Sequence, residues 1–142
     1  MTDDLHRARG DQLTIERLYA LLMLRVNIFI VEQRSPYPDL DGRDLDPATI
    51  HLWYEEAGVP IAYLRVLAGP PARIGRVCTA PAARGTGLST RLMHAALAEL
   101  DSREVVLDAQ VQAQGMYARF GFHPEGEPFD DDGVMHITMR RG

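Results

Sequence analysis

The chain of 142 residues contains no lysine, so all 15 of its basic residues are arginines. A phosphate-binding P-loop ends in Gly-Lys-Ser or Gly-Lys-Thr, and the lack of lysine excludes that type of nucleotide site. The 20 acidic residues outnumber the basic ones, and the resulting formal net charge of −5 argues against broad affinity for nucleic acids. We therefore expect no nucleic-acid partner.

Cysteine and long apolar runs are scarce as well. Cys78 is the single cysteine, which excludes an internal disulfide and is typical of a reducing compartment. It lies in an apolar run, where a cysteine is more often buried than a nucleophile. No stretch approaches the roughly 18 consecutive apolar residues of a membrane span, and the first residues, Met-Thr-Asp-Asp, do not resemble a targeting segment. We expect a cytoplasmic protein with no membrane partner.

What remains is the composition of an ordinary globular domain, with 46% hydrophobic and 25% charged residues. This length fits one core, so we expect a single domain over residues 1–142. Thr14 is placed to cap a helix from Ile15 to about Val31, along which apolar residues recur at helical spacing. The segment 34–48, rich in proline and aspartate, predicts a long ordered loop or a short helix.

Further elements follow from apolar runs and turn residues. Strands are predicted at 50–54, 61–67, 73–79 and 105–107, helices at 89–100 and 112–120, and a closing hairpin at 124–129 and 134–139. This order predicts an α+β fold with a mixed, mostly antiparallel central sheet and helices on both faces.

One segment, residues 77–90, combines a strand, a glycine-bearing turn and the start of a helix. The first N–H groups of a helix lack partners inside it, and together with the helix dipole they stabilise an anion. Gly85 and Gly87 leave the main chain open to a bulky ligand and allow positive φ, while Arg84 adds a permanent cation. The dinucleotide fingerprint is excluded because Thr90 stands where its third glycine belongs. An ordinary turn is the alternative, since Gly-x-Gly alone is a weak motif.

A second segment, residues 110–122, carries Tyr117 on a predicted helix that ends at Gly121. Together the two segments resemble motifs A and B of the GNAT superfamily of acyl-CoA-dependent N-acyltransferases. Motif A, Gln/Arg-x-x-Gly-x-Gly/Ala, is similar to residues 82–87. Motif B, Asn-x-x-Ala-x-x-x-Tyr-x-x-x-Gly-Phe, is similar to residues 110–122, and the order and spacing of the two motifs also fit.

A third set of residues narrows the resemblance to the ElaA-like subfamily. These are Leu24–Gln33, Pro36–Asp39, Asp41-Gly42 and His51. The similarity extends from about residue 13 to residue 136. It implies an N-acetyltransferase with the GNAT fold and leaves the acceptor open.

The resemblance also implies the roles of particular residues toward acetyl-CoA or a related acyl-CoA. Tyr117 matches the family tyrosine and is expected to protonate the leaving thiolate, because a phenol with a pKa of about 10 keeps its proton at neutral pH. A main-chain N–H near Thr79 is expected to stabilise the oxyanion. The pyrophosphate is expected at Arg84, Gly85, Thr86, Gly87, Leu88, Ser89 and Thr90, the pantetheine arm along Val77, Cys78 and Thr79, and the CoA chain at Gln110, which replaces the family asparagine.

The general base is left open by this sequence. Many family members carry a glutamate on the motif A strand, whereas the predicted strand 73–79 has no acid, and Ala82 replaces the leading Gln/Arg of the motif. Glu32 is the first candidate, His51 the second and Asp108 the third, and a water chain to a carbonyl would also serve. Each of the three side chains also has a purely structural interpretation.

Neither the aspartates of 39–46 nor the five histidines have the spacing of metal ligands, so we expect no metal. The negative field of 39–46 favours a cationic acceptor, either a small molecule such as a polyamine or a peptide lysine. We expect a monomer or a homodimer. Two alternatives remain: an acyl-CoA-binding sensor without catalysis, and an acyltransferase with a longer acyl donor, since residues 25–33 are also similar to signal-lactone synthases.

Overall fold

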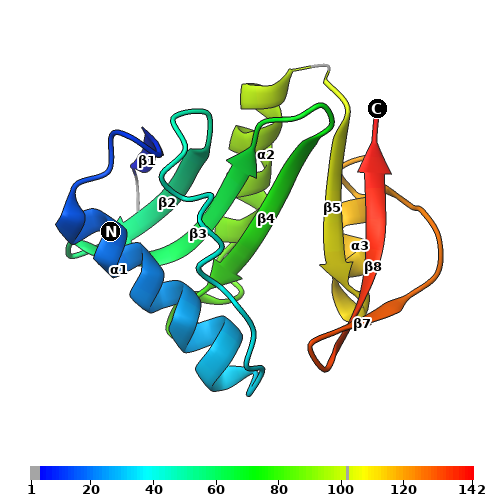
Figure 1. Ribbon diagram of the computed structural model, residues 1–142, viewed down its shortest axis with the longest axis horizontal. Helices are drawn as coiled ribbons and strands as arrows, with labels where there is room; N and C mark the ends of the chain where they lie inside the picture. Colours follow the sequence, from blue (N-terminus) through cyan, green and yellow to red (C-terminus); the bar gives the residue numbers. More distant parts are fainter. Residues whose placement is uncertain (1–3, 102) are drawn as a thin grey trace.

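The computed structural model describes residues 4–101 and 103–142, which build an eight-stranded mixed sheet. Its strand order is β1-β2-β3-β4-β5-β8-β6, and β7 also pairs with β8 (Figure 1). The β4–β5 pair is parallel, and the other pairs are antiparallel. The strands are β1 Leu5–Arg9, β2 Ile50–Glu56, β3 Val59–Leu67, β4 Ala72–Thr79, β5 Val105–Gln110, β6 His123–Pro124, β7 Phe129–Asp131 and β8 Val134–Arg141.

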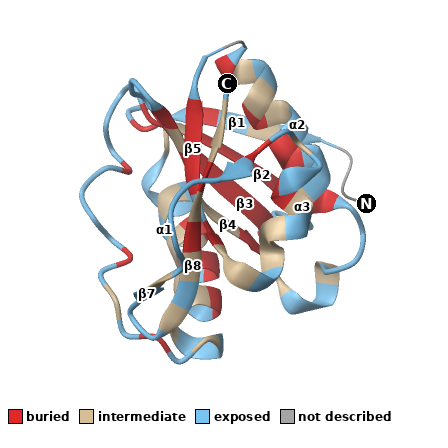
Figure 2. Ribbon diagram, turned by 90° about the vertical axis from the view of Figure 1, so that its right-hand side faces the viewer, coloured by how far each residue is buried: buried red, intermediate tan, exposed pale blue. Residues whose placement is uncertain are grey.

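Helices cover both faces of this sheet. Figure 2 shows the buried central strands between α1 on one side and α2 and α3 on the other. On one face lies α1 (Ile15–Val26), which continues into a π-helical segment, η1 (Asn27–Glu32). The other face is covered by α2 (Leu88–Leu100) and α3 (Gln114–Ala118), the latter preceded by the 3-10 turn η3 (Val111–Ala113). A further 3-10 turn, η2 (Pro81–Ala83), follows β4. The predicted α+β architecture is confirmed.

Alternation along the strands divides the core into two parts, because successive side chains point to opposite faces of a sheet. Leu52 and Tyr54 pack with the α2 side, whereas Trp53 between them packs with Leu21 and Leu24 of α1. Thr14 caps α1 by accepting a hydrogen bond from the Arg17 amide at 3.1 Å, so the predicted cap is confirmed.

The sheet opens between β4 and β5. These strands pair only at Ala72 with Val105 and Arg73 with Val106, and then diverge, as Figure 1 shows. Beyond this point β4 also contains a bulge toward β3, where Tyr63 faces Cys78 but Arg65 faces Gly75. Most of one edge of β4 therefore has no neighbouring strand.

Several boundaries differ from the sequence-based expectation. The strand β1 was not predicted, because only Ala8 of its five residues is buried and the segment shows no apolar alternation. The segment 34–48 forms a loop without a helix. The predicted helix 112–120 is split into η3 and α3, and the first arm of the closing hairpin is reduced to β6 and β7. None of the helices in the described parts of the chain has the length and apolar character that a membrane crossing requires.

Candidate active site

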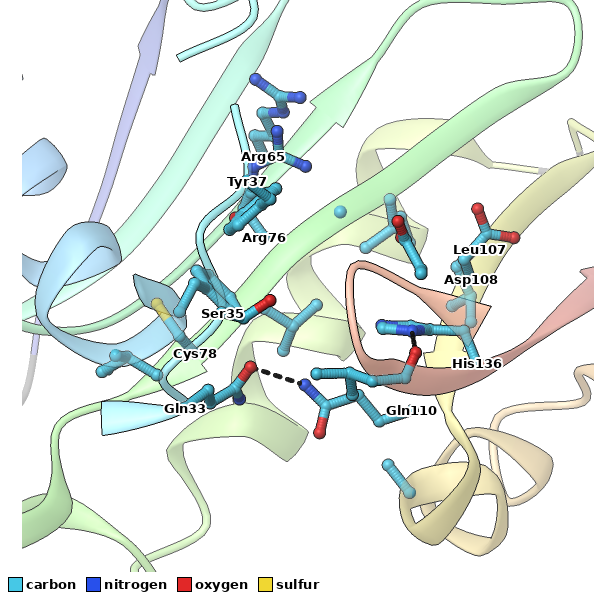
Figure 3. A pocket seen from close by; sticks show the side chains of 18 of the residues that line it. Gln33, Ser35, Tyr37, Arg65, Arg76, Cys78, Leu107, Asp108, Gln110 and His136 are labelled. Atoms are coloured by element: carbon cyan, nitrogen blue, oxygen red, sulfur yellow. Dashed lines mark hydrogen bonds between the residues drawn. The ribbon is translucent and has the colours of Figure 1, made fainter. Parts of the chain in front are cut away.

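A cavity of about 760 Å³ occupies the opening between β4 and β5. Its walls come from η1, β4, β5, α3 and the β7–β8 hairpin, so that segments far apart in the sequence meet around it (Figure 3). The structure brings together most of the side chains predicted for the site, namely Glu32, Val77, Cys78, Thr79, Arg84, Ser89, Asp108, Gln110 and Tyr117.

The turn before α2 has the open helix start that anion binding requires. Gly87 is the N-cap of α2 with φ of +84° and makes no side-chain cap, so no capping side chain covers the first amides of the helix. Gly85 has φ of +78°, and a Cβ added at either glycine would meet nothing within 4 Å. Positive φ rather than crowding therefore selects glycine here, and free space lies above the main chain.

The remaining residues of this turn do not line the cavity itself. Thr86 and Leu88 line a smaller hollow of about 230 Å³ instead, together with Arg91 of α2. Thr79 and Ser89 link the end of β4 to the start of α2 through their hydroxyl oxygens, which lie 3.0 Å apart.

Arg84 is paired rather than free. Its guanidinium donates to both carboxylate oxygens of Glu32, at 2.7 and 2.6 Å, and its Nε donates to the carbonyl of Thr79 at 3.0 Å. The hydrogen bonds from Arg84 lower the pKa of Glu32, which makes this carboxylate a weaker proton acceptor. The cation expected beside the helix start is therefore present, with its guanidinium held by Glu32.

Tyr117 reaches the cavity from α3 and is only 7% exposed. Its ring packs edge-on against Phe122, with centroids 6.4 Å apart. Burial raises the pKa of Tyr117 to about 12, so the phenol keeps its proton throughout the physiological range. Within the described chain, the hydroxyl has no hydrogen-bond partner and is not sealed from solvent, which leaves it open to the cavity.

Cys78 lies on β4 beside the cavity and is buried, as its apolar surroundings predicted. Burial raises the pKa of its thiol to about 12. Because the thiolate is the reactive form, this thiol has little nucleophilic character.

His51 does not belong to the cavity. The side chain is 1% exposed, and both ring nitrogens have partners, the Tyr63 hydroxyl at 2.6 Å and the Asp44 carbonyl at 2.8 Å. Burial lowers the pKa of His51, which keeps the ring neutral. The structure thus separates this predicted base from the other site residues and gives it a structural role in the core.

Next to His51 lies an arginine–aspartate cluster that the sequence did not predict. Arg25 of α1 donates to the Asp39 carboxylate at 3.1 Å, the Asp39 carbonyl at 2.8 Å and the Asp44 carboxylate at 2.7 Å. Arg65 of β3 donates to Asp44 at 3.0 Å and also pairs with Asp41. We define this arginine–aspartate cluster by its six members, Arg25, Asp39, Asp41, Asp44, Arg65 and Arg76.

The cluster corrects the expectation of a negative field from residues 39–46. Arg76 of β4 donates to the Asp39 carboxylate at 2.9 Å, so three arginines balance three aspartates. Burial alone would raise the pKa of Asp41, but the hydrogen bonds from Arg65 hold it well below its usual range. The loop therefore supplies ordered, paired charges rather than an attraction for cationic acceptors.

The wall opposite β4 carries polar groups from β5 and β8 (Figure 3). Asp108 accepts hydrogen bonds from Arg73 at 3.0 Å and from the Thr138 hydroxyl at 2.7 Å. The Gln110 amide donates to Gln33 at 3.3 Å across the cavity. His136 is a member of this wall that the sequence did not single out.

Among residues 4–101 and 103–142, no group of three or more histidine, cysteine or acidic side chains is arranged to hold a metal ion. The cavity instead offers main-chain groups, a helix start, a phenol and an imidazole. Such groups can bind an anionic ligand and move protons.

Comparison with known proteins gives consistent matches over almost the whole chain. Residues 29–141 match the family described as acetyltransferase (GNAT) domain. The chain is 46% identical to UPF0039 protein Rv2851c of Mycobacterium tuberculosis, over 99% of this chain and 94% of that protein. It is 38% identical to protein ElaA of Escherichia coli, over 97% and 94%.

Solved structures agree with these matches. The crystal structure of an acyl-CoA N-acyltransferase from Pseudomonas aeruginosa superposes with a TM-score of 0.92 at 40% identity, covering 98% of this chain and 99% of that one. The crystal structure of Escherichia coli ElaA superposes with a TM-score of 0.89 at 34% identity, covering 99% and 100%.

Proposed function

Because the chain belongs to the GNAT acetyltransferase family and to its ElaA-like branch, we propose that it transfers an acetyl group from acetyl-CoA to a primary amine. The observation that supports this most is the cavity at the β4–β5 opening, which joins an uncapped helix start to the phenol of Tyr117. A thioester donor with a diphosphate group needs both features.

The donor lies across the turn and along β4 in this proposal. Its pyrophosphate accepts hydrogen bonds from the amides of residues 84–90 at the start of α2. Its pantetheine arm runs beside Val77, Cys78 and Thr79, where β4 has diverged from β5 and offers unpaired main-chain groups. Gln110 contacts the CoA chain after its hydrogen bond to Gln33 opens.

The reaction is direct attack of a neutral amine on the thioester carbonyl. A main-chain N–H near Thr79 stabilises the oxyanion that develops. Tyr117 donates its proton to the leaving sulfur, for which its raised pKa of about 12 keeps it in the protonated form. The acceptor is a small-molecule or peptide amine. The buried free thiol of Cys78 supports a reducing compartment, and we include a cytoplasmic location in the proposal.

The experiment has a binding arm and a turnover arm. Calorimetry with CoA tests the donor site, and thiol release from acetyl-CoA in the presence of a panel of primary amines tests transfer. Tyr117→Phe should lower the turnover number about a hundredfold at saturating donor and leave CoA affinity within about twofold. An unchanged turnover number would remove the acid role from Tyr117.

The same assay separates the sensor alternative from the enzyme. A sensor would bind CoA and release no thiol with any amine. Because the chain contains no lysine, acetyl-lysine found in a peptide acceptor assay cannot come from lysines of the protein itself.

A further inference from the structure

The proposed transfer needs a group that removes a proton from the attacking nitrogen. The three candidates named from the sequence are all bonded to other side chains: Glu32 to Arg84, His51 to Tyr63 in the core, and Asp108 to Arg73 and Thr138. Building on the proposed function, we infer that His136 is the general base, which takes the amine proton on its Nε2 atom.

The tautomer of His136 follows from its neighbour. Its Nδ1 lies 2.8 Å from the carbonyl oxygen of Val134. A carbonyl oxygen can only accept a hydrogen bond, so Nδ1 carries the proton. In the neutral ring Nε2 is then the atom with the lone pair. Across the described residues Nε2 has no hydrogen-bond partner, so this lone pair is available to a ligand.

The position of the ring is fixed from two sides. His136 on β8 lies opposite Gln110 on β5 and opposite Phe129 on β7. The ring stacks on Phe129 with centroids 6.1 Å apart and planes inclined by 27°. The ring is half-buried, and Figure 3 shows it beside Gln110 and Asp108, on the cavity wall formed by β5 and β8. A base held this way needs no rearrangement to meet an amine in the cavity.

Acidic side chains lie on the same side of the cavity as His136. Asp108 projects from β5 on the same face, because it pairs in register with Thr138, two residues from His136. Its carboxylate is shared with Arg73 of β4. Asp131 and Asp132, at the turn between β7 and β8, also line the cavity.

The neutral amine nitrogen forms the N–C bond with the thioester carbonyl carbon, and its proton passes to Nε2 of His136. The C–S bond then breaks, and the sulfur takes the phenolic proton of Tyr117. Solvent returns the proton from the imidazolium to the phenolate, so that the products are the amide and the free thiol of CoA.

Two substitutions at this position separate the chemical role from a structural one. His136→Asn keeps an amide N–H near the position of Nδ1, and can still bond the Val134 carbonyl, but it removes Nε2. His136→Gln places an amide near Nε2 that cannot take up a proton. His123→Gln is the matched control, because His123 is an exposed histidine of β6 outside the cavity lining.

The kinetic readout is the rate of thiol release from acetyl-CoA in the presence of aniline, a weakly basic amine that is largely neutral in neutral and mildly acidic solution. The same rate is measured with water alone as the background. Both His136 variants should lose about a hundredfold in rate, with CoA affinity by calorimetry within about twofold of the wild type. Because a base acts only in its unprotonated form, the wild-type rate should decrease on acidification, and the variants should lose this dependence. His123→Gln should match the wild type.

The outcomes distinguish this inference from the proposed function. If the wild type is active and both His136 variants keep its rate and pH dependence, the role of His136 is refuted and the proposed transfer stands. Wild-type protein that binds no CoA, or binds it without releasing thiol, would overturn the proposed transfer and this role with it. Independently of any acceptor, long-range ¹H–¹⁵N NMR of the wild type should show His136 with its proton on Nδ1, and a proton on Nε2 in the neutral ring would contradict the inference.

Discussion

Replacing Arg25 by methionine should lower the free energy of unfolding of this protein substantially. The guanidinium is 1% exposed and makes three hydrogen bonds, to the carboxylate and carbonyl of Asp39 and to the carboxylate of Asp44. Methionine has a similar volume, so packing is largely kept while the charge and its three hydrogen bonds are lost. The change leaves Asp39, whose side chain is fully buried, and Asp44 with reduced compensation.

Removal of one partner from a buried ion pair costs about 3–5 kcal/mol, because the remaining charge stays buried without compensation. Small domains have a free energy of unfolding of about 5–15 kcal/mol, so Arg25→Met should remove at least about a fifth of it. Arg65 and Arg76 still contact the same aspartates, which places the expected loss at about 3 kcal/mol, the lower end of that range.

Urea unfolding followed by circular dichroism measures this difference. Arg119→Met is the matched control, since Arg119 is exposed, and it should change the free energy of unfolding by less than about 0.5 kcal/mol. A variant in which Arg25→Met is combined with Asp39→Asn should recover part of the loss, because Arg65 and Arg76 then face the two remaining carboxylates, Asp41 and Asp44. A loss below about 1 kcal/mol for Arg25→Met at an unchanged m-value would refute the reasoning.

Three further predictions concern the donor turn, the cavity and pH. Gly87→Val should weaken CoA binding more than tenfold in calorimetry, because valine disfavours the φ of +84° that opens the start of α2; unchanged affinity would contradict this. Gly75→Ala should fold normally, since a Cβ there meets nothing within 4 Å, yet lower the turnover number by narrowing the cavity; full activity would contradict this. The pKa of His51 is lower in the folded protein than in the unfolded chain, so its stabilising contribution is present above about pH 6.5 and is lost as pH falls. Urea midpoints at about pH 7.5 and about pH 5.5 should differ more for the wild type than for His51→Gln.

The fold could be predicted from the sequence because most of its helices and strands are marked by patterns of neighbouring residues. Thr14 marks the start of α1, and the two glycines before α2 mark the turn whose positive φ values the structure contains. β1 could not be predicted, since an edge strand with one buried residue shows no alternation of apolar and polar side chains. Local patterns thus identify elements that bury a continuous face and miss those held by main-chain pairing alone.

The polar part of the site depends on long-range pairing that a single sequence does not encode. Arg25 lies on the apolar face of its helix, and a charged residue at such a position indicates a buried partner of opposite charge. The partners themselves lie 14 and 19 residues away in a loop without regular structure. His136 enters the cavity wall only because β8 pairs with β5 in a particular register, with Gln110 opposite it. Nothing in the spacing of the histidines predicts that register.

The most direct test of the central claim is a crystal structure of the protein with CoA bound. We expect the pyrophosphate on the amides of residues 84–90, the pantetheine arm along the open edge of β4, and the sulfur within reach of the Tyr117 hydroxyl. CoA bound away from the β4–β5 opening, or absent at millimolar concentration, would contradict this claim.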